Sequence, residues 1–349
     1  MESAIPPHLR HQRKCPMTMP DGHRPPFPAW TTRFAAESES IVMACIGVQH
    51  QRYPAVSVMK VIADYLSVPQ GPAHWDLSSV VDADGSHNLV AIAYWHSTEQ
   101  FRDWQEKSQF LAWWQSPQRE DEEYGYFMEV VTVRPPQIET IFSDKQTPEG
   151  AAHLADGMSD EITEHGYWGS ARDRLPAAQC HTLEGSTEAL TINHVGKRTL
   201  ISGHHNLCLI RSGQDWSMTQ AEERVKYLTE VEPILREGMN FLRDQGHTAG
   251  CLSCRYMTLL DPITYALTEK TFALAHFTDM RALEEWAKHH PTHVAIFDGF
   301  MRYVQALNFT VALKLWHEIV VVPAEAQHFE YINCHPGTGL LTSNSGSVR

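Results

Sequence analysis

The chain has 349 residues, and its 28 Lys and Arg against 42 Asp and Glu give a formal net charge of −14. This acidity argues against nucleic acid as a partner, because affinity for polyphosphates depends on basic residues that release counterions. No apolar run reaches the length of about 18 residues that a membrane-spanning helix needs, so we expect no membrane partner. The first residues lack a secretory signal, and the seven cysteines form no disulfide pattern. These features predict a cytoplasmic protein with free thiols.

Residues 1–39 are expected to form an extended N-terminal arm, since seven of the 20 prolines come before residue 31. Residues 40–160 are expected to form the first half of the folded chain. Three apolar, β-branched runs there predict strands, at 40–49, 88–97 and 126–133. The apolar spacing of residues 56–67 predicts a helix, and a second helix is predicted over 98–115 with Ser97 as its N-cap.

The second half, residues 161–342, repeats this order of elements, and residues 343–349 form a tail. Its predicted strands are 199–211, 251–261, 270–278 and 313–323. A long amphipathic helix is predicted over 221–245, and another begins at Asp279 and must break or restart at Pro291. Strand, helix, strand, strand, helix, strand is the order of the ferredoxin-like unit. We therefore predict an α+β fold of two duplicated ferredoxin-like units whose sheets pair into a barrel.

The 21 histidines and 10 tryptophans are unusually many, so the histidines are candidates for chemistry. In HHPTH (289–293), Pro291 suits the first position of a helix, which would place His293 in the first turn. The proline forbids the continuous helix that a pair of zinc-binding histidines needs. Cys251 and Cys254 form a CxxC with neither a second pair nor the His of covalent haem attachment. An axial ligand of non-covalently bound haem remains, against the alternative that His293 only packs or caps.

Three further segments hold side chains that can serve chemistry or structure. Period-two alternation puts His317 on the same face of a predicted strand as the apolar Ile319, so it is either a buried, hydrogen-bonded histidine or an acid/base in a dry pocket. Arg172 and Arg174 are either solvated or placed to hold a carboxylate or polarise a substrate oxygen. Ser212 is expected in a loop after a strand, and it lacks the G-x-S-x-G context of a serine hydrolase.

Several segments together are similar to a known family. From MESAI at the start, the similarity runs through GPAHWDL (71–77), EHGYWGS (164–170), IRSGQDW (210–216), HPTH (290–293) and YINCHPGTG (331–339). In these segments the chain resembles the haem-containing aldoxime dehydratases, which convert R–CH=N–OH to a nitrile and water. The resemblance implies haem b, active in its ferrous form, a small-molecule aldoxime as substrate, and a homodimer of α+β barrel subunits.

The resemblance also implies a role for each of five residues. His293 matches the proximal iron ligand, and His317 matches the catalytic histidine on the distal side. Ser212 matches the serine that binds the oxime hydroxyl, Arg174 the distal arginine, and Glu139 of QIET the acidic residue that assists the histidine. Two other classes of protein remain as alternatives on the same fold, a haem-binding or haem-transfer protein and a peroxidase-like haem enzyme.

Overall fold

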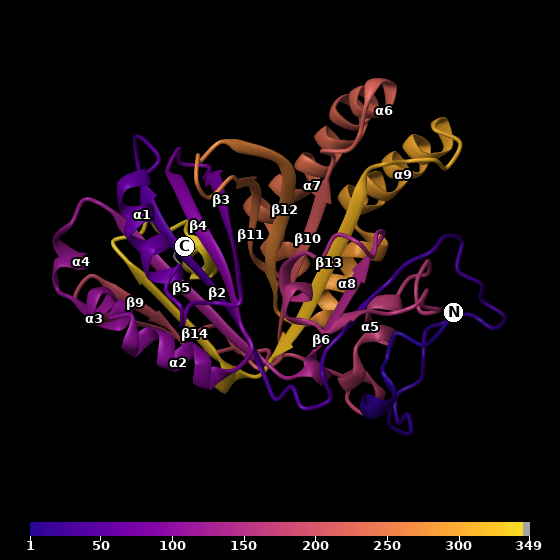
Figure 1. The fold of residues 1–349 in the computed structure, drawn as a ribbon, viewed down its shortest axis with the longest axis horizontal. Helices are drawn as coiled ribbons and strands as arrows, with labels where there is room; N and C mark the ends of the chain where they lie inside the picture. Colours follow the sequence, from indigo (N-terminus) through magenta and orange to yellow (C-terminus); the bar gives the residue numbers. More distant parts are fainter. Residues whose placement is uncertain (345–349) are drawn as a thin grey trace.

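The architecture is one large antiparallel sheet whose two halves face each other, with helices on the outer sides. A computed structural model describes residues 1–344 of the chain. Twelve strands follow one another in the order β6-β13-β10-β12-β11-β3-β4-β2-β5-β14-β9-β8. The two halves of this sheet diverge like the sides of a V (Figure 1). No helix of the described residues is long and apolar enough to cross a membrane.

The first unit has the β-α-β-β-α-β order, although the sequence predicted only three of its four strands and missed the one at His74–Val81. Its elements are β2 (Ile41–His50), α1 (Val56–Leu66), β3 (His74–Val81), β4 (His87–Trp95), α2 (Thr98–Lys107), α3 (Phe110–Gln115), α4 (Gln118–Asp121) and β5 (Gly125–Val133). The helix predicted over 98–115 is two helices, because Gln109 has a left-handed backbone with φ of 67° that ends the first of them. Ser97 caps α2 as predicted, its hydroxyl accepting from Gln100 N.

The second unit repeats this topology. Its elements are β10 (Leu207–Asp215), α6 (Ala221–Lys226), α7 (Glu232–Gln245), β11 (Cys251–Leu260), β12 (Leu267–Phe277), α8 (Met280–His289), α9 (Pro291–Ala306) and β13 (Lys314–Val322). A π-helical turn, Tyr227–Val231, joins α6 to α7, where Pro233 in the first turn of α7 cannot donate a backbone hydrogen bond. The single strand predicted over 199–211 is wrong. The chain turns between two strands there, and Asn206 has φ of 55°.

Each unit also lends one strand to the other. After its fourth strand, each unit makes a short 3-10 turn and returns as a strand of the opposite sheet. Thus β6 (Ile138–Phe142) pairs with β13, and β14 (Gln327–Ile332) pairs with β5. The edge strands β9 (Arg198–Ile201) and β8 (Ile192–Val195) then extend β14. The two halves of the sequence, expected to meet at residue 160, are therefore not the two halves of the sheet. Strand β6 comes from the first half of the sequence but belongs to the second half of the sheet, and β14 does the reverse.

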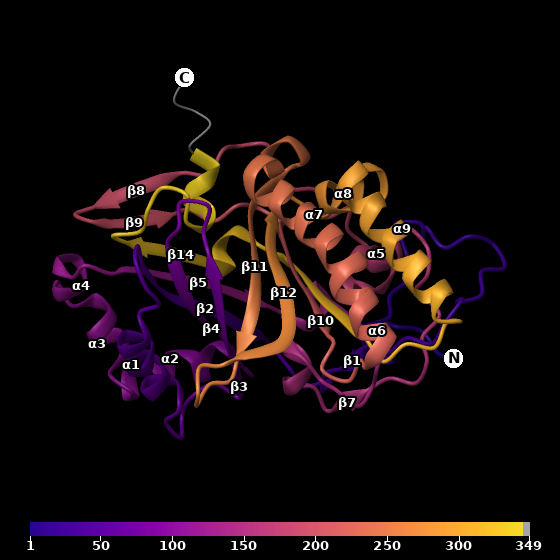
Figure 2. The same ribbon diagram turned by 90° about the horizontal axis from the view of Figure 1, so that it is seen from above.

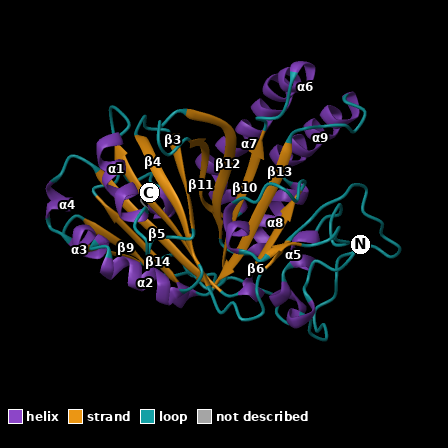
Figure 3. Ribbon diagram, viewed as in Figure 1, coloured by secondary structure: helices purple, strands orange, loops and turns teal. Residues whose placement is uncertain are grey.

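The two units join edge to edge and also pack face to face. Only Leu77–Ser79 of β3 and Thr258–Leu260 of β11 pair across the junction. On the other side β5 contacts β13 without pairing with it. The inner faces share one apolar core, which includes Val90, Ile92, Phe127, Met257, Leu274 and Val320. Helices α1 to α3 cover the outer face of the first unit, and α7 and α8 cover that of the second (Figures 2 and 3).

The N-terminal arm lies along the second unit of its own chain. Backbone N–H groups of Lys14 and Cys15 donate to the carbonyl of Gln179, and β1 (Thr32–Arg33) pairs with β7 (Gly157–Met158). The helix α5 (Ser170–Arg174) lies against this arm (Figure 1). The remaining 3-10 turns are η1 (Pro7–Leu9), η2 (Pro135–Gln137), η3 (Gly150–Leu154), η4 (Pro176–Gln179), η6 (Gly246–Ala249), η7 (Ala324–Ala326) and η8 (Gly339–Asn344).

Gly47 of β2 tests how tightly the core between the units is packed. A Cβ there would lie 2.0 Å from the ring of Phe127, so Gly47→Ala must displace that ring. We expect unfolding to become easier by about 1–3 kcal/mol, measured by urea denaturation. The control is Gly157→Ala, where no atom lies within 4 Å of the added Cβ. Equal stability of the two variants would contradict the tight packing.

Candidate active site

Two polar side chains face each other on the outer side of the second sheet. In the register of β10 with β13, Ser212 lies opposite His317. Their face also carries Cys208 and Ile319, which pack toward the helices. The predicted loop at Ser212 is wrong, because this residue lies within β10. The strand continues through Gly213 because its missing Cβ leaves room for the indole of Trp316, 2.3 Å from where that atom would lie.

A buried carboxylate joins His317 to the arginine of α5. Glu139 Oε1 lies 2.9 Å from His317 Nε2, and Arg174 Nε donates to Glu139 Oε2 at 2.6 Å. The Glu139 side chain is wholly buried and that of Arg174 almost so, whereas His317 keeps 24% of its side chain exposed. The structure thus brings together Ser212, His317, Arg174 and Glu139 from four different elements.

The contacts of His317 Nε2 fix which ring nitrogen carries a proton. Arg174 Nη2 also lies 3.1 Å from Nε2. One nitrogen cannot donate to a carboxylate and accept from a guanidinium at the same time, and the carboxylate is the stronger partner. Nε2–H therefore points to Glu139. Nδ1 makes no hydrogen bond to the described residues, which leaves it able to exchange a proton with a substrate.

Electrostatics keep Glu139 ionised despite its burial. Burial alone would raise the pKa of this carboxyl, but the charges of Arg174 and His317 and their hydrogen bonds hold its pKa below the ordinary value. Arg174 Nη1 also donates to the carbonyl of Glu164 at 2.9 Å and to Ser170 Oγ at 3.2 Å. The guanidinium is therefore fixed on three sides.

The other arginine of the same helix serves a different contact. Arg172 forms an ion pair with Glu284 of α8, with Nη2 2.6 Å from the carboxylate. Of the two arginines singled out in the sequence, only Arg174 reaches Glu139 and His317.

His293 lies in the first turn of α9, as its place after Pro291 predicted. The helix is capped by His290, whose Nδ1 accepts from Thr292 N. The His293 ring meets Trp286 edge to face at 4.7 Å between centroids, and Trp168 lies 6.0 Å away. Within residues 1–344 it makes no hydrogen bond or ring contact with Glu139, Arg174, Ser212 or His317.

The surroundings of His293 fit an axial haem ligand. Its Nδ1 is buried and makes no hydrogen bond of normal geometry to the described residues, although the backbone of Ala287 acts on the ring and favours its protonated form. Burial lowers the pKa of the imidazole to about 4, so the ring is neutral at pH 7. A neutral imidazole with aromatic neighbours is the form that binds haem iron. The sequence did not predict the contact between Trp286 and His293. The two residues lie in different helices on either side of Pro291, so the periodicity of a single helix does not predict that they meet.

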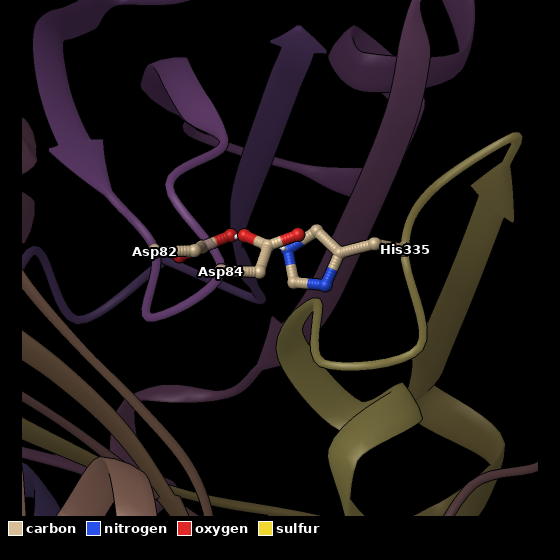
Figure 4. A group of neighbouring side chains, drawn as sticks. All are labelled: Asp82, Asp84 and His335. Atoms are coloured by element: carbon tan, nitrogen blue, oxygen red, sulfur yellow. Dashed lines mark hydrogen bonds and ion pairs between the residues drawn. The ribbon is translucent and has the colours of Figure 1, made fainter. Parts of the chain in front are cut away.

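A second group of possible metal ligands is a structural junction. Asp82 and Asp84, in the turn between β3 and β4, meet His335 (Figure 4). His335 Nδ1 accepts from Gly337 N at 3.0 Å, so Nε2 carries the proton and donates it to Asp82 Oδ2 at 2.8 Å. With no lone pair left for a metal, this imidazole ties the C-terminal segment YINCHPGTG to the first unit.

Comparisons with known proteins identify the family. Residues 44–340 match the model of the haem-containing dehydratases. The chain is 40% identical to the aliphatic aldoxime dehydratase of Rhodococcus erythropolis, covering 98% of each protein. It is 32% identical to the phenylacetaldoxime dehydratase of Bacillus sp. (strain OxB-1), covering 93% of each. A crystal structure of an aldoxime dehydratase in complex with butyraldoxime has a TM-score of 0.93 and 38% identity over 98% of this chain and 96% of that one.

The chain therefore belongs to the haem-containing dehydratase family, among the aldoxime dehydratases. It is a lyase, and haem is the cofactor of its family. The family predicted from the sequence segments is confirmed.

Removing the Glu139 carboxylate tests the electrostatics of the site. Glu139→Gln leaves Arg174 buried without its anion, so we expect a loss of about 3–5 kcal/mol in unfolding free energy at neutral pH. Because the folded pKa lies below the ordinary value of 4.5, this stabilisation is complete above pH 4.5 and is lost as the pH falls through the folded pKa. Denaturant titrations at several pH values should show the difference shrinking in acid. The exposed Glu285→Gln is the control; a pH-independent loss for Glu139→Gln would contradict the ion pair.

Proposed function

We propose that this chain dehydrates small aliphatic or arylaliphatic aldoximes, R–CH=N–OH, to nitriles and water. The observation that carries the proposal is the placement of His317, held by a buried carboxylate on one ring nitrogen, free on the other, and opposite the hydroxyl of Ser212. Membership of the family supports it, as do the names of the relatives. We further propose a homodimer, which analytical ultracentrifugation of the haem-loaded protein tests.

We assign haem b as the cofactor, and the imidazole of His293 would hold its iron. When bound in the ferrous state, the haem supplies an electron-rich iron that favours departure of a poor leaving group from nitrogen. Trp286 and Trp168 orient the imidazole through ring contacts and shield it from water. The other four residues act on the substrate or on the group that exchanges protons with it.

Ser212 and His317 can hold the oxime hydroxyl between them. Directly opposite residues of an antiparallel pair have Cβ atoms about 4.5–5.5 Å apart. The hydroxyl of Ser212 makes no hydrogen bond to the described residues, so it can donate to or accept from a substrate oxygen. Arg174 keeps donor capacity on Nη2 beside His317. These groups fix the leaving oxygen next to the proton donor.

His317 acts first as an acid and then as a base. Protonated at Nδ1, it gives its proton to the oxime oxygen. The N–O bond then breaks, and its electron pair stays on the oxygen, which departs as water. The neutral imidazole then takes the hydrogen on carbon as a proton, and the C–H electron pair becomes the third bond of the nitrile. Atoms and charge balance without net oxidation. Glu139 stabilises the imidazolium and keeps the ring oriented through Nε2–H.

Replacing His317 tests the proton-transfer step. His317→Ala should keep the Soret band of the loaded protein and lose turnover by a factor on the order of 10²–10⁴, because the proton donor and acceptor are one group. Nitrile formation is followed by chromatography, anaerobically and after reduction with dithionite. His328→Ala, an exposed histidine on β14, is the matched control. Turnover by His317→Ala near that of the control would remove this residue from the mechanism, and a wild type that forms no nitrile from any aldoxime class would refute the function.

Replacing His293 tests the cofactor assignment without any assay of activity. His293→Ala should purify with little haem and lose it on gel filtration, seen as a fall in the ratio of Soret to protein absorbance. His289→Ala, an exposed histidine at the end of α8, should keep wild-type haem content. Full haem retention by His293→Ala would show that another residue holds the iron.

A further inference from the structure

We propose that Arg172 is a positioning residue, which fixes helix α5, and with it the guanidinium of Arg174, relative to the helix that supports His293. The inference rests on the proposed function for the roles of Arg174 and His293. Arg172 itself contacts neither of them.

Helix α5 cannot orient itself. It has five residues, Ser170–Arg174, and no side chain caps its N-terminus, where Gly169 has φ of 91°. A single helical turn is unstable alone, because nucleation fixes many dihedral angles for few hydrogen bonds. The placement of α5 therefore depends on what its side chains contact, which for Arg172 and Asp173 adds to the contacts of Arg174 itself.

Asp173 attaches one side of α5 to the N-terminal arm. Its buried carboxylate accepts from Thr18 N and Thr18 Oγ1, each at 2.9 Å, from Met19 N at 3.1 Å and from Tyr167 Oη at 2.9 Å. These contacts hold α5 against the N-terminal arm. None of them reaches the helices α8 and α9 on the other side.

Arg172 supplies the contact on that other side. Its Nε lies 3.0 Å from Glu284 Oε1 and its Nη2 lies 2.6 Å from Oε2, which makes a bidentate ion pair. Its Nη1 donates to the carbonyl of Thr182 at 2.7 Å. The two charged side chains are only 20% and 25% exposed. A planar guanidinium bound at both prongs fixes orientation as well as distance, which a lysine cannot do.

Glu284 lies on the helix that orients His293. Two residues further along α8, the indole of Trp286 packs against the His293 ring, and its Nε1 donates to Thr292 Oγ1 at 3.3 Å. The ion pair therefore connects the helix carrying the distal arginine to the helix supporting the proximal histidine. If the pair is broken, α5 can rotate and carry Arg174 away from Glu139 and His317.

The test compares Arg172→Gln with a matched variant, Arg224→Gln, which breaks a two-pronged pair with Glu269 remote from these residues. Turnover is expressed per bound haem. For Arg172→Gln we expect kcat to fall by roughly 10- to 100-fold, the effect of a displacement near 1 Å, with KM changed far less because Ser212 is untouched. Haem transfer to excess apomyoglobin should accelerate several-fold. Arg172→Lys should lie between the wild type and Arg172→Gln in both measurements, and Arg224→Gln should match the wild type.

If Arg172→Gln folds poorly, a variant that exchanges the charges of Arg172 and Glu284 tests the inference instead. The double variant Arg172→Glu, Glu284→Arg should recover at least about tenfold in kcat over Arg172→Glu alone, and slow haem transfer again, as a restored pair would. Equal kcat in Arg172→Gln and Arg224→Gln, or no recovery in the double variant, would overturn the inference. Because every value is a ratio to the wild type, a wild type that forms no nitrile refutes the proposed function instead, and the haem-transfer rates still test Arg172.

Discussion

The register between β10 and β13 is the constraint on which the active half of the molecule depends. It places Ser212 opposite His317 on the helix side and Arg211 opposite Glu318 on the core side. A slip by one residue would exchange the two faces of a strand. Such a slip is costly, because the wholly buried Arg211 donates to Tyr94 Oη, which in turn hydrogen-bonds Glu318, and these groups would lose their partners. The contacts of Arg211 and Glu318 inside the core thus keep Ser212 and His317 on the helix side of the sheet.

The same buried charges connect the two units. Arg211 of β10 pairs with Asp76 of β3 at 2.7 Å, and Arg255 of β11 pairs at both prongs with Glu129 of β5, at 2.6 and 2.7 Å. Both pairs lie inside the shared core, where apolar side chains could fill the space with equal or greater stability. Their directionality favours one mutual placement of the two sheets. The unit without the site therefore helps to determine the geometry of the unit that has it.

The sequence predicted best what depends on local pattern. Pro291 placed His293 in a first turn, and period-two alternation placed His317 on the same strand face as Ile319. The sequence could not place Glu139 beside His317, because that contact arises when β6 leaves its own half of the chain to pair with β13. It misplaced Ser212 because its glycine neighbour indicates a turn, whereas here glycine makes room for an indole. The roles of these residues came from family resemblance, which carries the long-range contacts that periodicity lacks.

The repeated topology of the two units shows what sets the site apart within the described residues. In each unit the returning strand brings a carboxylate to an arginine, Glu139 to Arg174 in the second unit and Glu330 to Arg198 in the first. His317 comes directly before the buried glutamate of β13, and Met128 has the same place on β5. Aromatic side chains pack on that face of the first unit, namely Trp95, Trp104, Phe110 and Trp114. The carboxylate–arginine pair is thus a property of the strand exchange, present in both copies. What distinguishes the second copy is an imidazole in place of an apolar side chain, together with the His293 helix in place of the aromatic packing.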